Sequence, residues 1–192
     1  MAIVQTSPPV QTPVSLGDAK AHLRVDGSDE DALIISLIET ATAHIEHSHG
    51  LALITQGLTI FRDDWPDNWL VELPVSPLQS VTSITTFEAD GGSFAFDAGH
   101  WFVDTAMRPP RIVLHGTAPW PQPGRRANGI EIALMAGYGD TSDDVPTPIR
   151  QAALLLVAHW FEQREPVSLG AGSQEIPSTV ASLLGPYRLV RL

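Results

Sequence analysis

VPTPIRQAALLLVAHWFEQREP, residues 145–166, is the stretch of the chain that decides its fold. Thr147 is a good N-cap, and Pro148 suits the first helical turn, where its missing N–H costs nothing. Pro166 ends the helix, because the residue before a proline is disfavoured in the helical region. Apolar side chains recur at helical spacing along one face of this segment: Ile149, Ala152, Ala153, Leu156, Val157, Trp160 and Phe161.

The other side of this predicted helix is also largely apolar, because it carries Leu154, Leu155 and Ala158. A helix that is apolar nearly all round must be covered on more than one side. In a chain of 192 residues, we expect a neighbouring subunit to provide that cover, which favours an assembly protein over a solitary enzyme. The predicted subunit interface consists of Leu154, Leu155, Ala158, Trp160 and Phe161.

Composition indicates a folded chain with one domain, or a small core that carries an insertion. The apolar fraction is 43%, which is enough for a hydrophobic core, and the absence of cysteine excludes disulfides and thiolate metal sites. The longest apolar run, residues 152–158, is far shorter than the roughly 18 residues of a membrane span. Residues 1–14 lack a basic stretch and are broken by prolines, so we expect an extended arm and no signal peptide.

The charge of the chain is lopsided, with 22 acidic and 11 basic residues. Residues 1–145 carry a net charge of −12, and residues 146–192 carry +1. A nucleic-acid-binding domain normally clusters its basic residues, so sequence-directed DNA binding is not expected. The acidity favours solubility, and it also suits a surface that DNA passes without binding.

Two further helices are predicted before the long one. Ser15 and Asp18 form a cap-like pair at the start of a helix that ends near Val25. Ser28 with Asp31 indicates the start of a second helix, which Gly50 ends. A fourth helix is predicted from Ser178 to Leu184, after a loop at residues 168–173.

Residues 54–137 have the pattern of short strands and turns. Asp90-Gly91-Gly92 predicts a hairpin turn between Phe87 and Phe94. The six predicted strands are Thr55 to Arg62, Trp69 to Leu73, Val81 to Glu88, Trp101 to Val103, Arg111 to His115 and Ile130 to Ala136.

The predicted fold is therefore α+β, a small bundle of about four helices with an inserted antiparallel sheet or open barrel. The expected division is an arm (1–14), a helical core (15–53 and 138–185), an inserted β block (54–137) and a C-terminal tail (186–192).

No constellation of residues adds up to a catalytic or metal site. His44 and His47 lie three residues apart on a predicted helix, but a zinc helix usually spaces its histidines by four with an adjacent glutamate, and Glu46 is misplaced for that. His159 is read as a hydrogen-bonded histidine, and residues 170–173 lack the lysine of a phosphate loop. We expect no catalytic residue, no metal and no cofactor.

Two alternatives stay open. One is a small metal-dependent enzyme that uses His44, His47 and an acid from the strand block. The other is a monomeric module whose strand block binds a peptide or sugar among its tryptophans.

Five segments, in order, resemble the tailed-phage head–tail connector (adaptor) family, which includes prophage and gene-transfer-agent members. They are SLGDAKAHLRVD (15–26), DEDALIISLIETA (29–41), LPVSPLQSVTSITTFEADGG (73–92), PIRQAALLLVAHWFEQRE (148–165) and VASLLGPYRLVRL (180–192). The resemblance implies a non-enzymatic virion protein that forms a ring, commonly dodecameric, beneath the portal protein. Such a ring gives a platform to the next neck, stopper or tail-completion protein, and genomic DNA passes through its channel. No membrane is involved.

The resemblance also implies that the C-terminal segment docks on the portal. Tyrosine and arginine are favoured as interface anchors, and we expect this short tail to stay unfolded until it is bound. The predicted docking residues are Pro186, Tyr187, Arg188, Leu189, Arg191 and Leu192.

Overall fold

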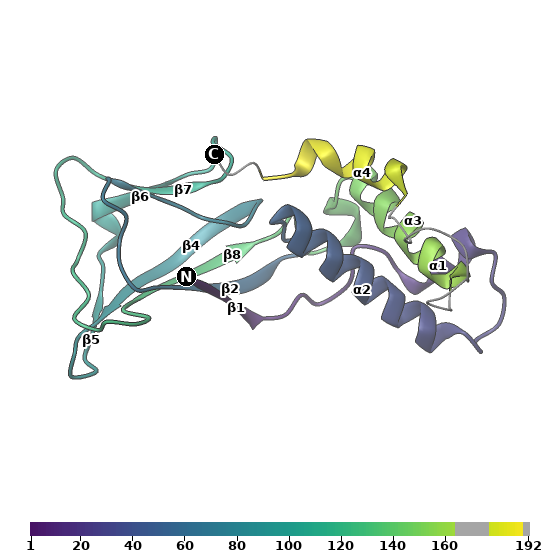
Figure 1. Ribbon diagram of the computed structural model, residues 1–192, viewed down its shortest axis with the longest axis horizontal. Helices are drawn as coiled ribbons and strands as arrows, with labels where there is room; N and C mark the ends of the chain where they lie inside the picture. Colours follow the sequence, from purple (N-terminus) through teal and green to yellow (C-terminus); the bar gives the residue numbers. More distant parts are fainter. Residues whose placement is uncertain (164–176, 190–192) are drawn as a thin grey trace, which may run out of the picture. The chain divides into compact units, whose positions relative to one another are not determined.

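A computed structural model describes residues 1–163 and 177–189 and divides the chain into two compact units (Figure 1). Of these described residues, the β unit comprises 1–9, 55–137 and 189, and the helical unit comprises 10–54, 138–163 and 177–188. The predicted α+β class, with four α-helices and antiparallel sheets in the described residues, is confirmed. The functional boundaries drawn around the arm and the tail stay predictions.

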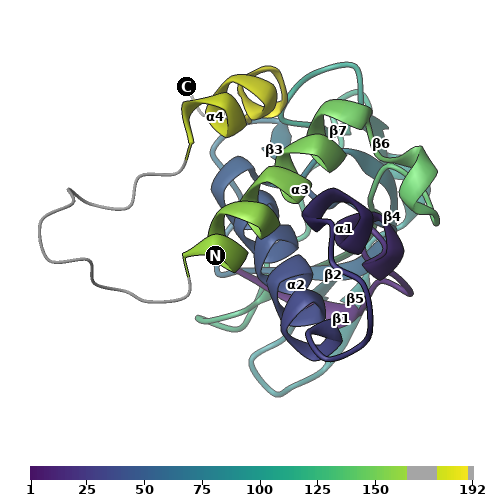
Figure 2. The same ribbon diagram turned by 90° about the vertical axis from the view of Figure 1, so that its right-hand side faces the viewer.

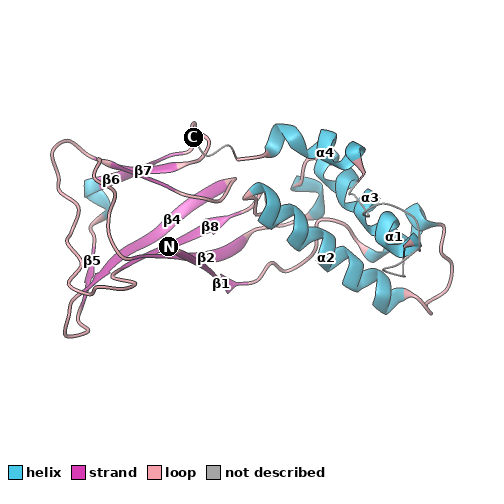
Figure 3. Cartoon of the chain, viewed as in Figure 1, coloured by secondary structure: helices cyan, strands magenta, loops and turns pink. Residues whose placement is uncertain are grey.

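The β unit is built on a five-stranded antiparallel sheet with the order β1-β2-β8-β4-β5. Its strands are β1 (Ala2–Ser7), β2 (Gln56–Arg62), β8 (Ile130–Ala136), β4 (Leu78–Phe87) and β5 (Ser93–Ala95). A three-stranded sheet has the order β3-β7-β6 and contains β3 (Leu70–Glu72), β7 (Arg111–Leu114) and β6 (Trp101–Asp104). Figure 3 shows the strands of both sheets in magenta.

One row of side chains organises the larger sheet. Ile3, Ile60, Ile132 and Ile84 lie directly opposite one another on four neighbouring strands. The last three are fully buried, whereas Ile3 at the edge is 44% exposed. The alternation of buried and half-buried residues along β8 is the period-two pattern of a sheet with one covered face. The row therefore places the core of this unit under β2, β8 and β4.

All six predicted strands exist, within a few residues of the expected ends. The hairpin turn is confirmed as well, since Phe87 pairs with Ser93 across it and Gly91 has φ +94°. Two strands were not predicted. The short β5 completes that hairpin, and β1 lies in the segment expected to be an arm.

Four helices form the second unit: α1 (Leu16–Leu23), α2 (Asp31–His49), α3 (Thr147–Glu162) and α4 (Ser178–Leu184). Figure 2 shows α2 and α3 side by side, with α1 and α4 against them. Their buried residues form one core, which includes Ile34, Ile38 and Ile45 of α2 together with Ile149 and Leu156 of α3. No helix of the described residues is long and apolar enough to cross a membrane.

The predicted helix ends are partly confirmed. Ser15 caps α1 by accepting a bond from the Asp18 N–H, and Gly50 ends α2 in the left-handed conformation. Ser28 was wrongly assigned as a cap: the N-cap of α2 is Glu30, without a side-chain cap bond, and Ser28 contributes only its backbone carbonyl, to the Asp31 N–H.

At α3 the N-cap is Pro146, so Thr147 is the first helical residue. The helix ends at Glu162, and Pro166 and the loop at residues 168–173 lie outside the described residues.

The isoleucine row generates a stability prediction with a matched control. Ile132→Ala leaves a cavity at the centre of the row, so we expect the free energy of unfolding to fall by about 2–5 kcal/mol. Ile3→Ala, at the exposed end of the same row, is expected to cost about 1 kcal/mol or less. Urea unfolding followed by tryptophan fluorescence measures both, because four of the five tryptophans belong to the β unit. Equal losses at the two positions would contradict this assignment of the core.

Candidate functional site

Helix α3 has a buried inner face and an apolar outer face. Ile149, Ala152, Ala153, Leu156 and Val157 are buried in the helical core. The outer stripe runs through the half-buried residues Leu154, Leu155 and Ala158, and exposed Gln151 and Glu162 frame it. Within its own unit, α3 therefore leaves apolar surface of the predicted subunit interface partly open to solvent.

Trp160 and Phe161 are the other two predicted interface residues. Like Leu154 and Leu155, both are half-buried and pack against the buried cluster. The ring of Trp160 meets the ring of His44 edge to face, with a centroid distance of 6.0 Å. Because Trp160 also contacts His44 of α2, a substitution at Ala158 separates the predicted interface from the fold more cleanly than one at Trp160.

The first residues of the predicted docking tail are folded. Gly185–Tyr187 forms a 3₁₀ turn directly after α4, and the half-buried Tyr187 packs against the helical core. The expectation of a tail that stays unfolded until bound is therefore wrong for this part, because Tyr187 finds apolar contacts within its own unit. Pro186 and Arg188 are exposed, and Leu189 is half-buried. Arg191 and Leu192 lie outside the described residues.

The histidines of α2 form local contacts. His47 Nδ1 lies 2.7 Å from the carbonyl oxygen of Ala43, and His49 Nδ1 lies 2.8 Å from the Ser48 hydroxyl. His44 contacts Trp160 as described above. Among residues 1–163 and 177–189, no group of three His, Cys, Asp or Glu side chains is arranged to hold a metal ion.

His49 lies near the end of the folded tail, and its environment disfavours its charged form. Burial lowers the pKa of His49 from its ordinary value, and the positive charge of Arg188 lowers the pKa further. A bond to the Ile45 backbone opposes both effects. Burial is thus the main cause of the lowered pKa of His49, and Arg188 of the predicted docking segment adds to it.

The tryptophans of the β unit serve mainly its own packing. Trp65 stacks on Trp120 with a centroid distance of 4.3 Å. Their indole N–H groups donate to the carbonyls of Pro121 and Asn68, at 2.6 and 3.0 Å. Trp101 is buried, whereas Trp69 is 58% exposed. The tryptophans therefore do not line one common cavity.

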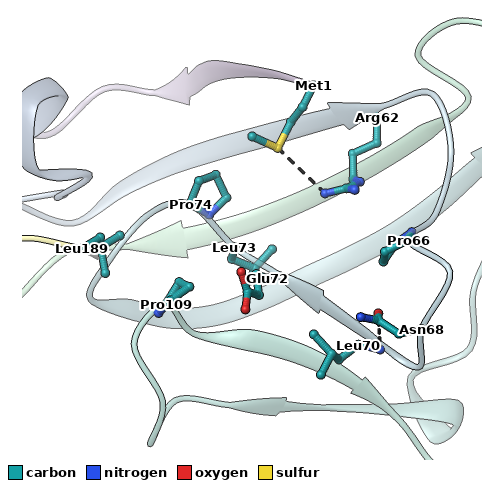
Figure 4. Close-up of a pocket in the computed structure, with 10 residues that line it drawn as sticks. All are labelled: Met1, Arg62, Pro66, Asn68, Leu70, Glu72, Leu73, Pro74, Pro109 and Leu189. Carbon is teal, nitrogen blue, oxygen red and sulfur yellow. Dashed lines mark hydrogen bonds between the residues drawn. The ribbon is translucent and has the colours of Figure 1, made fainter. Parts of the chain in front are cut away.

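A shallow pocket of about 360 Å³ lies in the β unit beside β3 (Figure 4). Its lining is mostly apolar, and its two charged residues are Arg62 and Glu72. Arg62 directs one guanidinium nitrogen at the Met1 sulfur, 3.9 Å away. The sequence did not predict this pocket, because its walls come from segments far apart in the chain. The lining residues are Met1, Arg62, Pro66, Asn68, Leu70, Glu72, Leu73, Pro74, Pro109 and Leu189.

Part of the chain matches a known protein family. Residues 13–86, from α1 to the end of β4, match the model of the family described as phage gp6-like head-tail connector protein. No curated protein sequence matches the chain.

Solved structures match over the whole length. A chain from the neck of an empty gene transfer agent (GTA) particle, computed with C6 symmetry, has a TM-score of 0.85 and 28% identity. A chain in the virion of a native gene transfer agent particle has a TM-score of 0.83 and 28% identity, and one in the native neck computed with C12 symmetry has 0.83 and 26%. Each match covers 100% of this chain and 97% of the other. Part of the chain thus resembles the head–tail connector family, and its whole fold is similar to that of a gene-transfer-agent neck protein.

The lowered pKa of His49 generates a pH prediction. A histidine whose folded pKa lies below its unfolded value binds fewer protons when folded, so stability falls as the pH falls below the unfolded value. We expect His49→Gln to remove this contribution. Unfolding in urea between pH 5 and 8 should show the wild type losing stability relative to the variant toward pH 5. A difference between the two proteins that does not change with pH would contradict the assignment.

Proposed function

We propose that this protein is a structural connector in the neck of a phage-like particle, where its copies form a ring below the portal protein. The observation that carries the proposal is the match of the complete chain to neck proteins of a gene transfer agent, together with the family match of residues 13–86. The protein is a virion component, and its role is mechanical: it joins a head to a tail and performs no catalysis.

The outer stripe of α3 is the proposed subunit interface of the ring. Leu154, Leu155 and Ala158 offer partly exposed apolar surface on a helix whose opposite face is already buried. Burial of such surface in a neighbouring copy is favourable by about 25 cal/mol per Å². Trp160 and Phe161 complete the proposed interface from the side of the core.

The C-terminal segment is the proposed contact with the portal. Tyr187 fixes the start of this segment on the helical core, so that the exposed Pro186 and Arg188 are presented at a defined place. Arginine is among the residues that most often dominate binding energy at interfaces. Leu189, Arg191 and Leu192 continue the proposed docking segment, and the ring's other end is proposed to receive a stopper or tail-completion protein.

Charge supports the proposed relation to DNA. The chain has a formal net charge of −11. A negatively charged channel surface repels the phosphates of DNA within a Debye length of about 8–10 Å. We therefore propose that genomic DNA passes through the ring without specific binding. Twelve copies per ring is the proposed number, in keeping with the family resemblance.

The connector proposal is tested by absolute mass. Light scattering on a sizing column is applied to the protein alone and mixed with the portal protein of the same particle. We expect a complex that elutes with the portal and contains several copies per portal ring. A protein that remains monomeric and separate from the portal would overturn the proposal.

A truncated protein lacking residues 188–192 tests the docking segment within the same experiment. The truncation ends after Tyr187, so it preserves the Tyr187 contact with the core and should leave the fold intact. It is expected to lose co-elution with the portal. Undiminished binding by this folded truncation would refute the docking role and leave the ring proposal standing.

The outer stripe of α3 generates a prediction with a matched control. Ala158→Arg places a charge in the proposed interface without removing a large core side chain, so we expect the number of copies bound per portal ring to drop sharply. Ala43→Arg makes the same change at an exposed position of α2 and should assemble normally. Mass measurement of both complexes gives the comparison, and normal assembly of the Ala158 variant would exclude this stripe from the interface.

A further inference from the structure

Strand β1 is an edge of the five-stranded sheet, and its pairing with β2 has one register shift, between Gln5 and Ser7. Within the described residues it pairs with β2 alone. Its sequence, AIVQTS, contains no charged residue and no proline. Natural proteins commonly guard edge strands with charges, prolines or covering segments, because free N–H and C=O groups invite pairing with another chain. An uncharged six-residue edge is therefore a template for one more strand.

The side chains of β1 are exposed on both faces of the sheet. Ile3 is 44% exposed and Val4 is 47% exposed, and these neighbours point to opposite faces. Ile3 is also the open end of the isoleucine row, whose other members are fully buried. A further strand beside β1 would extend that buried row by one position and cover apolar surface on both faces.

The opposite edge of the same sheet is β5, a strand of only three residues. β5 is fully exposed, its sequence is SFA, and its Phe94 is 52% exposed. Phe94 pairs with Thr86, which lies two residues from Ile84, so Phe94 and Ile3 belong to the same face of the sheet. Ala95 pairs with Thr85 and belongs to the other face.

A ring requires each copy to present two different surfaces that fit each other, whereas one self-complementary surface gives a closed pair. The two edges of the five-stranded sheet are such surfaces. We propose that β1 of one copy pairs with β5 of the next, so that neighbouring sheets are joined edge to edge around the ring. This inference rests on the proposed connector function, and it adds backbone pairing in the β unit to the α3 contact in the helical unit.

The absence of cysteine in the chain allows a disulfide test on assembled rings. Ile3→Cys combined with Phe94→Cys places two thiols on the same face of neighbouring strands about 4.8 Å apart, a backbone separation within the Cα–Cα range of a disulfide. Gln5→Cys combined with Phe94→Cys tests the same strand pairing with β1 shifted by two residues along β5, because Gln5 and Ile3 lie on the same face of β1. Ile3→Cys combined with Ala95→Cys is the matched control, because its thiols lie on opposite faces.

After oxidation of portal-bound rings, we expect one same-face variant to give a ladder of covalent multimers beyond the dimer on non-reducing gels, while the control gives none. Rings without a ladder in either same-face variant would overturn the strand pairing alone. Efficient dimers from Ile3→Cys by itself would show β1 paired with β1, which also overturns the proposal. If the wild-type protein forms no ring with the portal, the connector function fails first, and this inference fails with it.

Discussion

The packing of α3 against α2 is the interaction on which the helical unit depends. The two helices come from segments that the whole of residues 55–137 separates, so their contact closes the unit. Ala41 of α2 and Ala152 and Ala153 of α3 are buried in this core, and small side chains let two helices approach closely. The larger buried residues around them each contribute about 1.5–3 kcal/mol by leaving water. Everything proposed for the outer face of α3 requires that this inner face stay packed.

Helix α3 has one apolar face for folding and a second, partly apolar face that is available for the proposed assembly. The inner face is satisfied within the chain, so the protein can fold before it meets a partner. The outer face keeps Leu154 and Leu155 half-buried, which limits the apolar surface that a free copy exposes to water and still leaves area for a neighbour. Tyr187 does the same for the chain end, because its contact with the core orders the start of the proposed docking segment.

The features that could be predicted from the sequence are those that depend on residues close together along the chain. The period of α2 and α3, the caps at Ser15 and Gly50, the alternation in β8 and the turn at residues 90–92 all depend on neighbours along the chain. Strand β1 was missed because its order comes from pairing with β2, more than fifty positions away, and its own exposure shows no alternation. Burial of Tyr187 and the pocket beside β3 were missed for the same reason: distant segments form them. Ser28 was misassigned because Glu30 takes the cap position without a side-chain bond.

Charge and symmetry together bear on how the contacts between neighbouring copies hold the proposed ring together. Free copies with a net charge of −11 repel one another at short range, and salt screens this repulsion only beyond about 8–10 Å. Under the proposal, docking on a portal holds the copies side by side, which raises their effective concentration for one another. In the proposed ring, the helix stripe and the strand edge then each act once per copy. The same negative charge opposes both the association of free copies and the adhesion of DNA in the proposed channel, so one property of the surface serves both proposed stages.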